Sequence, residues 1–298
     1  MSIDSTALTE LPPRKAIVLD NENCPYCGAQ LVEGSWNKEH AIGRRFVPRG
    51  KFADSWNLIL RACITCNSRK ADLEDDLSAI TMQPDPTGEF ADPDPVLREE
   101  AMRKAAGSIN RRTGTTVGES AHTMTIALAP MPGVNASFTL NGPPQPDPDR
   151  VFELARMHAQ ALFYRVTYDA STRRGGFFLG DVYTISYCLR GDWGNAMHRA
   201  FMHGVSGWEP RCVAIAADRF FKAVIRRHPE ATCWSWAVEW NHNLRVIGFA
   251  GDRAPIDAIF AASPPAESRI VGRGADGSIL RLRVEVPLEA HEDVLFEA

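Results

Sequence analysis

Two short cysteine motifs constrain the fold of this chain more than any other part of the sequence. Cys24 and Cys27 form one Cys-x-x-Cys pair, and Cys63 and Cys66 form a second. Each pair can bring two thiolates to one ion from a tight turn, so the two pairs together predict a tetrahedral zinc site. Four thiolates leave no open position for a substrate. We therefore expect a structural zinc that replaces the hydrophobic core of a small module.

Composition places the chain among globular proteins. Its 298 residues are 44% hydrophobic and 23% charged, enough for one large domain or two ordinary ones. No stretch approaches about eighteen consecutive apolar residues, and the polar, acidic start lacks the layout of a signal peptide. We expect a cytoplasmic protein with no membrane span. Its other cysteines, Cys188, Cys212 and Cys233, are expected to be buried thiols rather than disulfide partners.

Basic residues are concentrated around the cysteine motifs. The chain as a whole has a net charge of -4, which gives no global signal for nucleic acid. Between positions 36 and 70, however, only Glu39 and Asp54 oppose a run of basic side chains: Lys38, Arg44, Arg45, Arg49, Lys51, Arg61, Arg69 and Lys70. A local basic surface on an acidic protein is typical of a site that faces phosphate groups.

The sequence divides into three parts. Residues 1–83 contain the cysteine motifs, and residues 84–120 have the proline-rich, acidic and glycine-rich composition of a linker, with a short helix expected at 96–106. Residues 121–298 predict a larger domain with a mainly antiparallel sheet, so the fold class is α+β. The expected helices of this domain are 151–168 and 193–203, and its extended segments are 123–129, 136–140, 177–187, 220–226, 232–240, 244–250, 269–271 and 279–286.

Two features of this second domain are interpreted as structural. Residues 272–277 match the pattern G-x-G-x-x-G, but a strand-like run follows where a phosphate-binding helix would be needed, which favours a hairpin turn. Seven of the eight histidines are expected to be structural. His198 and His203 are five residues apart and so do not share a helix face, and His242 falls in a predicted turn. The other four lack acidic or cysteine partners at ligand spacing: His122, His158, His228 and His291.

The segment between the two cysteine pairs carries the residues that suggest chemistry. Residues 36–43 predict a strand that runs into a turn, residues 56–61 predict a second strand, and a helix is expected over 66–77. The order is knuckle, strand, loop, strand, knuckle, helix. In this order the end of a strand and the start of a helix can face each other across one ion.

This segment resembles the HNH endonucleases, the ββα-metal or His-Me finger group, and is most similar to the subgroup with paired zinc knuckles. The resemblance is carried by Glu39-His40, by Asn57, and by the run Cys63-x-x-Cys66-Asn67-x-x-Lys70. It covers roughly residues 22–80 and implies nothing about the rest of the chain. It implies a zinc-stabilised ββα-metal module at the N-terminal end.

The resemblance assigns a role to each of these residues. His40 matches the general base that takes a proton from the attacking water, a role that the ordinary pKa of imidazole suits. Glu39 and Asn67 match the ligands of one catalytic ion, and their hard oxygen atoms favour Mg²⁺ or Mn²⁺. Asn57 matches an asparagine whose hydrogen bonds hold the loop and orient the histidine. The candidates for phosphate contacts are Arg44, Arg45 and Lys70.

The resemblance therefore implies a metal-dependent endonuclease that hydrolyses phosphodiester bonds in nucleic acid, with DNA as the favoured substrate. Two alternatives remain open: a catalytically inactive, zinc-containing nucleic-acid-binding protein, and a defence effector nuclease regulated by a ligand. In either nuclease case residues 121–298 are free to select substrate, to form a homo-oligomer, or to sense a regulatory ligand or protein.

Overall fold

The structure is a computed structural model and describes residues 9–11, 16–85, 88–131, 134–178, 182–261, 268–273 and 279–297. It is a mixed α+β fold in which most strands pair antiparallel. Within the described residues, no helix is both long enough and apolar enough to cross a membrane.

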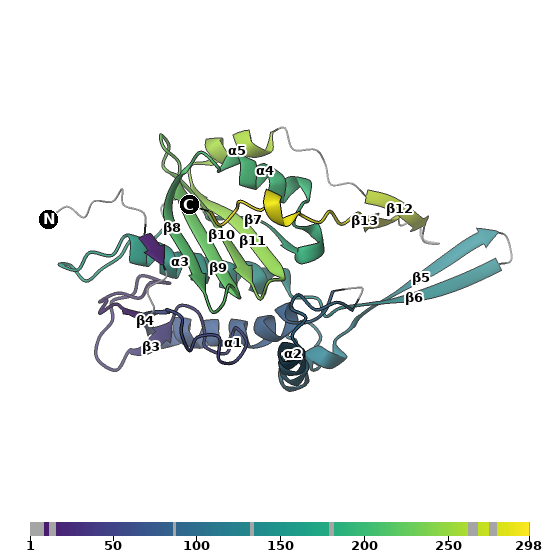
Figure 1. The fold of residues 1–298 in the computed structure, drawn as a ribbon, viewed down its shortest axis with the longest axis horizontal. Coiled ribbons are helices and arrows are strands. Elements are labelled where there is room, and N and C mark those ends of the chain that lie inside the picture. Colours follow the sequence, from purple (N-terminus) through teal and green to yellow (C-terminus); the bar gives the residue numbers. More distant parts are fainter. Residues whose placement is uncertain are drawn as a thin grey trace.

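A six-stranded sheet forms the centre of the molecule, in the strand order β1-β8-β9-β10-β11-β7 (Figure 1). The five longer strands pair antiparallel in this order, and β1 joins β8 in parallel. The strand bounds are β1 Thr9–Leu11, β7 Val182–Leu189, β8 Glu209–Ala216, β9 Phe221–Arg227, β10 Cys233–Trp240 and β11 Leu244–Gly251.

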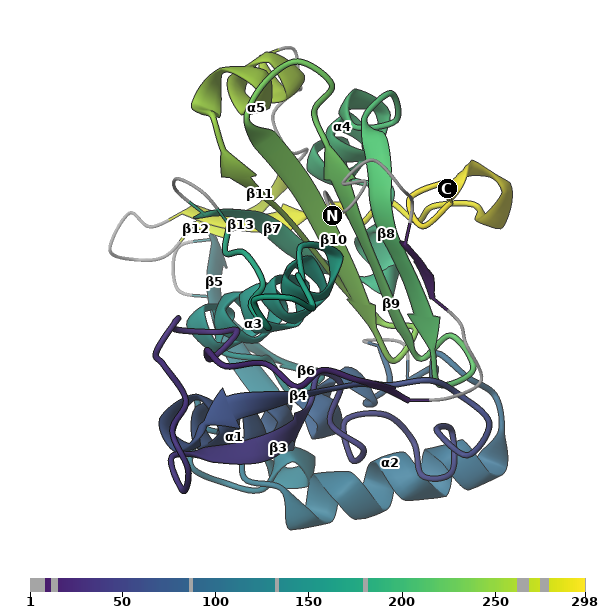
Figure 2. The ribbon, with the colours of Figure 1, turned by 90° about the vertical axis from the view of Figure 1, so that its left-hand side faces the viewer.

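Helices cover both faces of this sheet. Helix α3 (Pro148–Val166) lies across one face, while α4 (Ala196–Gly204) and α5 (Arg253–Phe260) lie on the other (Figure 2). Strand residues alternate between the two faces, as β10 illustrates: Trp236 and Val238 belong to the core under α3, whereas Cys233 and Ala237 belong to the core under α4 and α5.

The cysteine motifs belong to a small ββα unit. Its sheet has the order β2-β4-β3, with β2 at Ile17–Val18, β3 at Trp36–His40 and β4 at Leu58–Cys63. Strands β3 and β4 pair antiparallel, and helix α1 (Ile64–Thr81) follows β4 directly. The expected strand, strand and helix of this segment are therefore confirmed. Helix α1 runs four residues beyond the expected end at 77.

The expected linker contains a helix that packs on α1. Helix α2 (Pro95–Gly107) confirms the prediction at 96–106, and it begins where Asp94 Oδ1 accepts a hydrogen bond from the Val96 amide. A short 3₁₀ turn, Val117–Glu119, follows. Ala101 and Ala105 of α2 are buried, and Ala105 belongs to a small core with Ala79, Ile80 and Val117.

Two hairpins lie away from the central sheet. Strands β5 (His122–Met131) and β6 (Val134–Gly142) form a long ribbon that projects from the body (Figure 1), and β12 (Ser268–Arg273) pairs with β13 (Ile279–Arg283). The glycine pattern at 272–277 thus leads into a strand, as expected. Its turn lies outside the described residues. Further 3₁₀ turns occur at Arg190–Asp192 and Ala290–Glu292.

The expected separation into two domains with a linker is not accompanied by two separate cores. One continuous hydrophobic cluster contains Leu58 and Leu77 of the ββα unit together with Leu154 of α3 and Trp240 of β10. The sequence predicted a domain boundary at the proline-rich stretch 84–95, because the composition of a segment reports only on that segment. Contacts between distant segments decide whether a core is shared.

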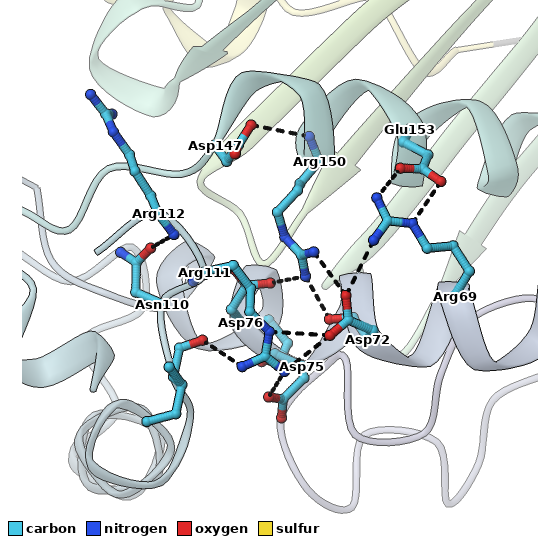
Figure 3. A network of polar contacts seen from close by, with 12 residues as sticks. Arg69, Asp72, Asp75, Asp76, Asn110, Arg111, Arg112, Asp147, Arg150 and Glu153 are labelled. Atoms are coloured by element: carbon cyan, nitrogen blue, oxygen red, sulfur yellow. Dashed lines mark hydrogen bonds and ion pairs between the residues drawn. The ribbon is translucent and has the colours of Figure 1, made fainter. Parts of the chain in front are cut away.

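An ionic network also joins α1 to α3 (Figure 3). Arg150 of α3 donates to Asp72 Oδ2 at 2.8 Å and to Asp76 Oδ1 at 2.7 Å, both on α1. Arg111, from the loop after α2, donates to Asp72 Oδ1 at 3.1 Å, and Arg69 of α1 pairs with Glu153 of α3 at 2.9 Å. The ββα unit is therefore bound to the rest of the chain by both apolar and ionic contacts.

Candidate active site

The four cysteines meet at one point. All of the Sγ atoms of Cys24, Cys27, Cys63 and Cys66 lie within 4.8 Å of one another, and the Cys27 and Cys63 sulfurs are 3.7 Å apart. A tetrahedral zinc with bonds of about 2.3 Å needs sulfur separations of about 3.8 Å. The residues therefore fit a four-thiolate metal site, as the spacing predicted.

Several side chains hold the cysteine turns in place. Asn21 is fully buried, and its side-chain amide bonds to the backbone of β4. Its Nδ2 donates to Arg61 O at 2.7 Å, and its Oδ1 accepts from Arg61 N at 2.8 Å. From α3, the Tyr164 hydroxyl donates to Asn23 Oδ1 at 2.6 Å. The first cysteine turn is thus fixed to β4 and to α3 independently of any ion.

A large cleft of about 1010 Å³ opens beside this unit, between α1, the loop after β3 and α2. It brings together five of the expected site residues, namely Glu39, His40, Arg44, Arg45 and Asn67. Asn57 lies in an adjoining cavity of about 360 Å³, which shares His40 and Arg44 with the cleft. Residues from strand end, loop and helix start therefore converge as the sequence order predicted.

His40 is half-buried and has the properties of a neutral base. Burial lowers its pKa, and the nearby cations of Arg44 and Lys38 lower it further. Its Nε2 atom is buried and makes no hydrogen bond to any of the described residues. Asn57 fixes the segment that follows, because its Nδ2 donates to Ile42 O at 2.7 Å and its Oδ1 accepts from Ile42 N at 3.3 Å.

Glu39 points into a buried ion pair. Its carboxylate lies 2.9 Å from the Lys70 ammonium and accepts a longer hydrogen bond, 3.3 Å, from the Tyr26 hydroxyl. Burial raises the pKa of Glu39, although Lys70 opposes this rise. Burial alone would lower the pKa of Lys70, but Glu74 and Glu39 more than offset it and keep the ammonium charged.

The expected phosphate contact of Lys70 does not fit its position. Only 1% of its side chain is exposed, and its Nζ contacts both carboxylates as well as His40 O at 3.1 Å. Arg44 and Arg45, by contrast, are exposed on the cleft. Lys70 is therefore a buried partner of the acidic residues, and the arginines remain the candidates for phosphate contacts.

Glu74 of α1 is a cleft residue that the sequence analysis missed. Its Oε1 accepts hydrogen bonds from Lys70, from Gly43 N at 2.9 Å and from His158 Nε2 at 3.3 Å. Burial would raise the pKa of Glu74, but Lys70 and His158 lower it to about 2. A Cβ atom on Gly43 would lie 2.1 Å from Glu74 Oε2, so this contact requires glycine.

The interpretation of His158 as structural is consistent with this contact, but its acidic partner was overlooked. The partner lies 84 positions away in the sequence, so no local spacing could reveal it. A local signal for Glu74 did exist, because Lys70 and Glu74 are four residues apart on one helix face.

The donors for a catalytic ion are few. Glu39 contributes a carboxylate and Asn67 an amide oxygen to the same cleft, and both are hard donors of the kind that Mg²⁺ and Mn²⁺ accept. Across the described part of the chain, the cysteine cluster alone gathers three or more Cys, His, Asp or Glu ligand atoms. The donor types therefore fit a hard ion with two protein ligands, but Lys70 already neutralises one of them.

Comparisons with protein-family models, with curated proteins and with solved structures found no match to this chain.

Proposed function

We propose that this protein is a metal-dependent endonuclease of the HNH type that hydrolyses phosphodiester bonds, with DNA as the favoured substrate. The observation that carries this proposal is the cleft itself. His40 lies there with Glu39, Asn67 and exposed arginines, beside a four-cysteine cluster. We also propose that the cysteine cluster holds a structural zinc and that the catalytic ion is Mg²⁺ or Mn²⁺.

The chain's own residues suggest the steps. A phosphate bound by Arg44 and Arg45 would lie within the cleft next to His40. The His40 imidazole accepts the proton of a water molecule, whose oxygen forms a new bond to phosphorus while the bond to the leaving 3′ oxygen breaks. A hard ion held by Glu39 and Asn67 would stabilise the negative charge that develops on the phosphate and on the leaving oxygen.

One observation favours a second candidate, a non-catalytic zinc protein that only binds nucleic acid. The Lys70 ammonium forms an ion pair with the Glu39 carboxylate at 2.9 Å, so a metal ion has to compete with Lys70 for this carboxylate. If that ion pair never opens, the basic cleft still binds phosphate but lacks its ion. Both candidate functions predict binding of nucleic acid, but only the first predicts its cleavage.

Cleavage by purified protein tests the first proposal. His40→Ala should lower the rate of plasmid cleavage by roughly 10² to 10⁴, because the general base is lost. The thermal melt should stay unchanged, because His40 is only half-buried. His203→Ala is the matched control, since His203 is exposed on α4 and does not line the cleft. A His40→Ala protein that cleaves as fast as wild type would remove His40 from the mechanism.

A further inference from the structure

Helix α2 presents one continuous face to the cleft. Glu100, Arg103, Lys104 and Gly107 all line it, and their spacing of three and four residues places them along one side of the helix. The buried residues Ala101 and Ala105 lie on a different side. A segment that composition marks as a linker is therefore a wall of the cleft.

Two contacts fix this wall to the opposite one. The Arg49 amide donates to both carboxylate oxygens of Glu100, each at 2.9 Å, and the Lys104 ammonium donates to Arg45 O. Both contacts involve the backbone of the loop, not its guanidinium groups. Helix α2 therefore positions the loop while the side chains of Arg45 and Arg49 remain exposed, with no carboxylate partner among the residues that the structure describes.

The charges left available in the cleft are mainly positive. Glu39 and Glu74 are paired with Lys70, and Glu100 is occupied by the loop amide. Arg103 reaches Glu100 only at 3.7 Å, and 69% of its side chain is exposed. One exposed acid remains in the cleft, Asp75. It is outnumbered by the exposed cations, which are Lys38, Arg44, Arg45, Arg49 and Arg103.

We infer that α2 is a second nucleic-acid-binding element, whose exposed Arg103 contacts the phosphate backbone of a DNA strand that lies along the cleft lined by α2 and the loop of residues 44–50. The inference rests on the proposed function for the identity of the ligand. It involves residues outside the segment that resembles HNH nucleases, and it extends the binding surface from the reacting phosphate to its neighbours along the strand.

Binding measurements on a cleavage-deficient protein test this surface. In the full-length His40→Ala background, the affinity for a labelled DNA duplex is measured by fluorescence anisotropy over a series of salt concentrations. Arg103→Glu should weaken binding roughly tenfold at low salt and reduce the slope of log K against log salt by about one. Arg98→Glu is the matched control, because it makes the same charge change on the same helix outside the cleft.

The control separates a local contact from a general effect of charge. Equal losses of affinity in Arg103→Glu and Arg98→Glu would overturn the inference, and so would failure of the His40→Ala protein to bind DNA. If wild-type protein binds DNA and never cleaves it, a selective loss in Arg103→Glu still supports the α2 surface. The nuclease proposal alone would then fall.

Discussion

At the scale of single residues, His158 connects the candidate site to the core of the molecule. Its ring contacts Phe46, Phe221 and Trp240 edge-on, with centroids 5.2 to 5.5 Å away, and its Nε2 lies 3.3 Å from Glu74. Burial lowers its pKa to about 4. The folded protein therefore keeps His158 neutral at a pH where the unfolded chain would protonate it.

This difference predicts a pH-dependent stability. Between pH 6.5 and about 4 the unfolded chain binds the proton and the folded chain does not, so acid favours unfolding. From about pH 7.5 to pH 5 the free energy of unfolding should fall by about 2 kcal/mol on account of His158. Glu74 does not contribute here, because its pKa shift acts below its ordinary value of 4.5.

Urea titrations of wild type and His158→Gln at both pH values measure this contribution. Glutamine can still donate to Glu74 but cannot take up a proton, so His158→Gln should lose less stability on acidification. His203→Gln, at an exposed position, should behave as wild type. An identical pH dependence in His158→Gln and wild type would show that His158 is not the group responsible.

The residues predicted from sequence are those whose partners are close in the chain. Glu39, His40 and Asn67, which line the cleft, and Asn57, which lines the adjoining cavity, all fall beside or between the cysteine motifs. The contact between Glu74 and His158 was missed because it joins α1 to α3. Lys70 was expected to contact phosphate because its charge was visible in the sequence, whereas its pairing with two carboxylates was not.

At the scale of elements, the cysteine cluster joins the end of β4 and the start of α1 to the loop before β3. Cys63 caps α1, since its Sγ accepts from the Cys66 amide at 3.5 Å. Serine can also cap a helix, so Cys63→Ser removes a metal ligand and retains a capping group. This substitution isolates the contribution of the metal.

We predict that Cys63→Ser loses the tightly bound zinc and the hydrogen-exchange protection of β3, β4 and the first turns of α1. The physical reason is that binding of a structural zinc is itself a large part of the folding free energy of such a unit. Metal analysis and exchange mass spectrometry measure the two effects. Cys233→Ser, at a buried position outside the cluster, should retain the zinc. A native-like melt of Cys63→Ser with one bound zinc would refute the assignment.

Most of the longer elements could be predicted from periodicity, but β8 and α5 were not, and neither were the short strands β1 and β2. Strand β8 contains Pro210 and a buried Arg211, which obscure its pattern, and α5 is a short helix with a proline in its first turn. Helix α4 begins at Ala196, not 193, because Asn195 Oδ1 caps it by accepting from His198 N. These differences arise from local capping and from tertiary contacts that override propensity.

At the scale of the whole molecule, the central sheet supports the loop that carries the cleft arginines. The Trp56 indole donates to Ile215 O at 2.7 Å, and Asn241 Nδ2 donates to Phe46 O at 3.2 Å and to Thr81 Oγ1 at 2.8 Å. Asn241 adopts the left-handed conformation, with φ of 52°, at the turn between β10 and β11. The turns at that end of the sheet therefore contact the ββα unit directly.

A fragment of residues 1–83 should therefore not fold by itself, even with zinc. It would expose Phe46, Trp56 and Leu77, which are almost fully buried in the shared core. The full chain should instead unfold in a single transition that involves both parts. Calorimetry of the fragment and of the full chain distinguishes the two cases. A cooperative melt of the zinc-loaded fragment would restore the two-domain description that the sequence suggested.

The most direct test of the central claim is digestion of plasmid DNA by the purified full-length protein, with Mg²⁺, with Mn²⁺ and with EDTA. The account predicts nicking or linearisation with either ion and none with EDTA, and loss of cleavage in His40→Ala. Binding of the plasmid with no cleavage under any divalent ion would contradict the nuclease proposal. It would leave the basic cleft as a nucleic-acid-binding surface whose Glu39 remains paired with Lys70.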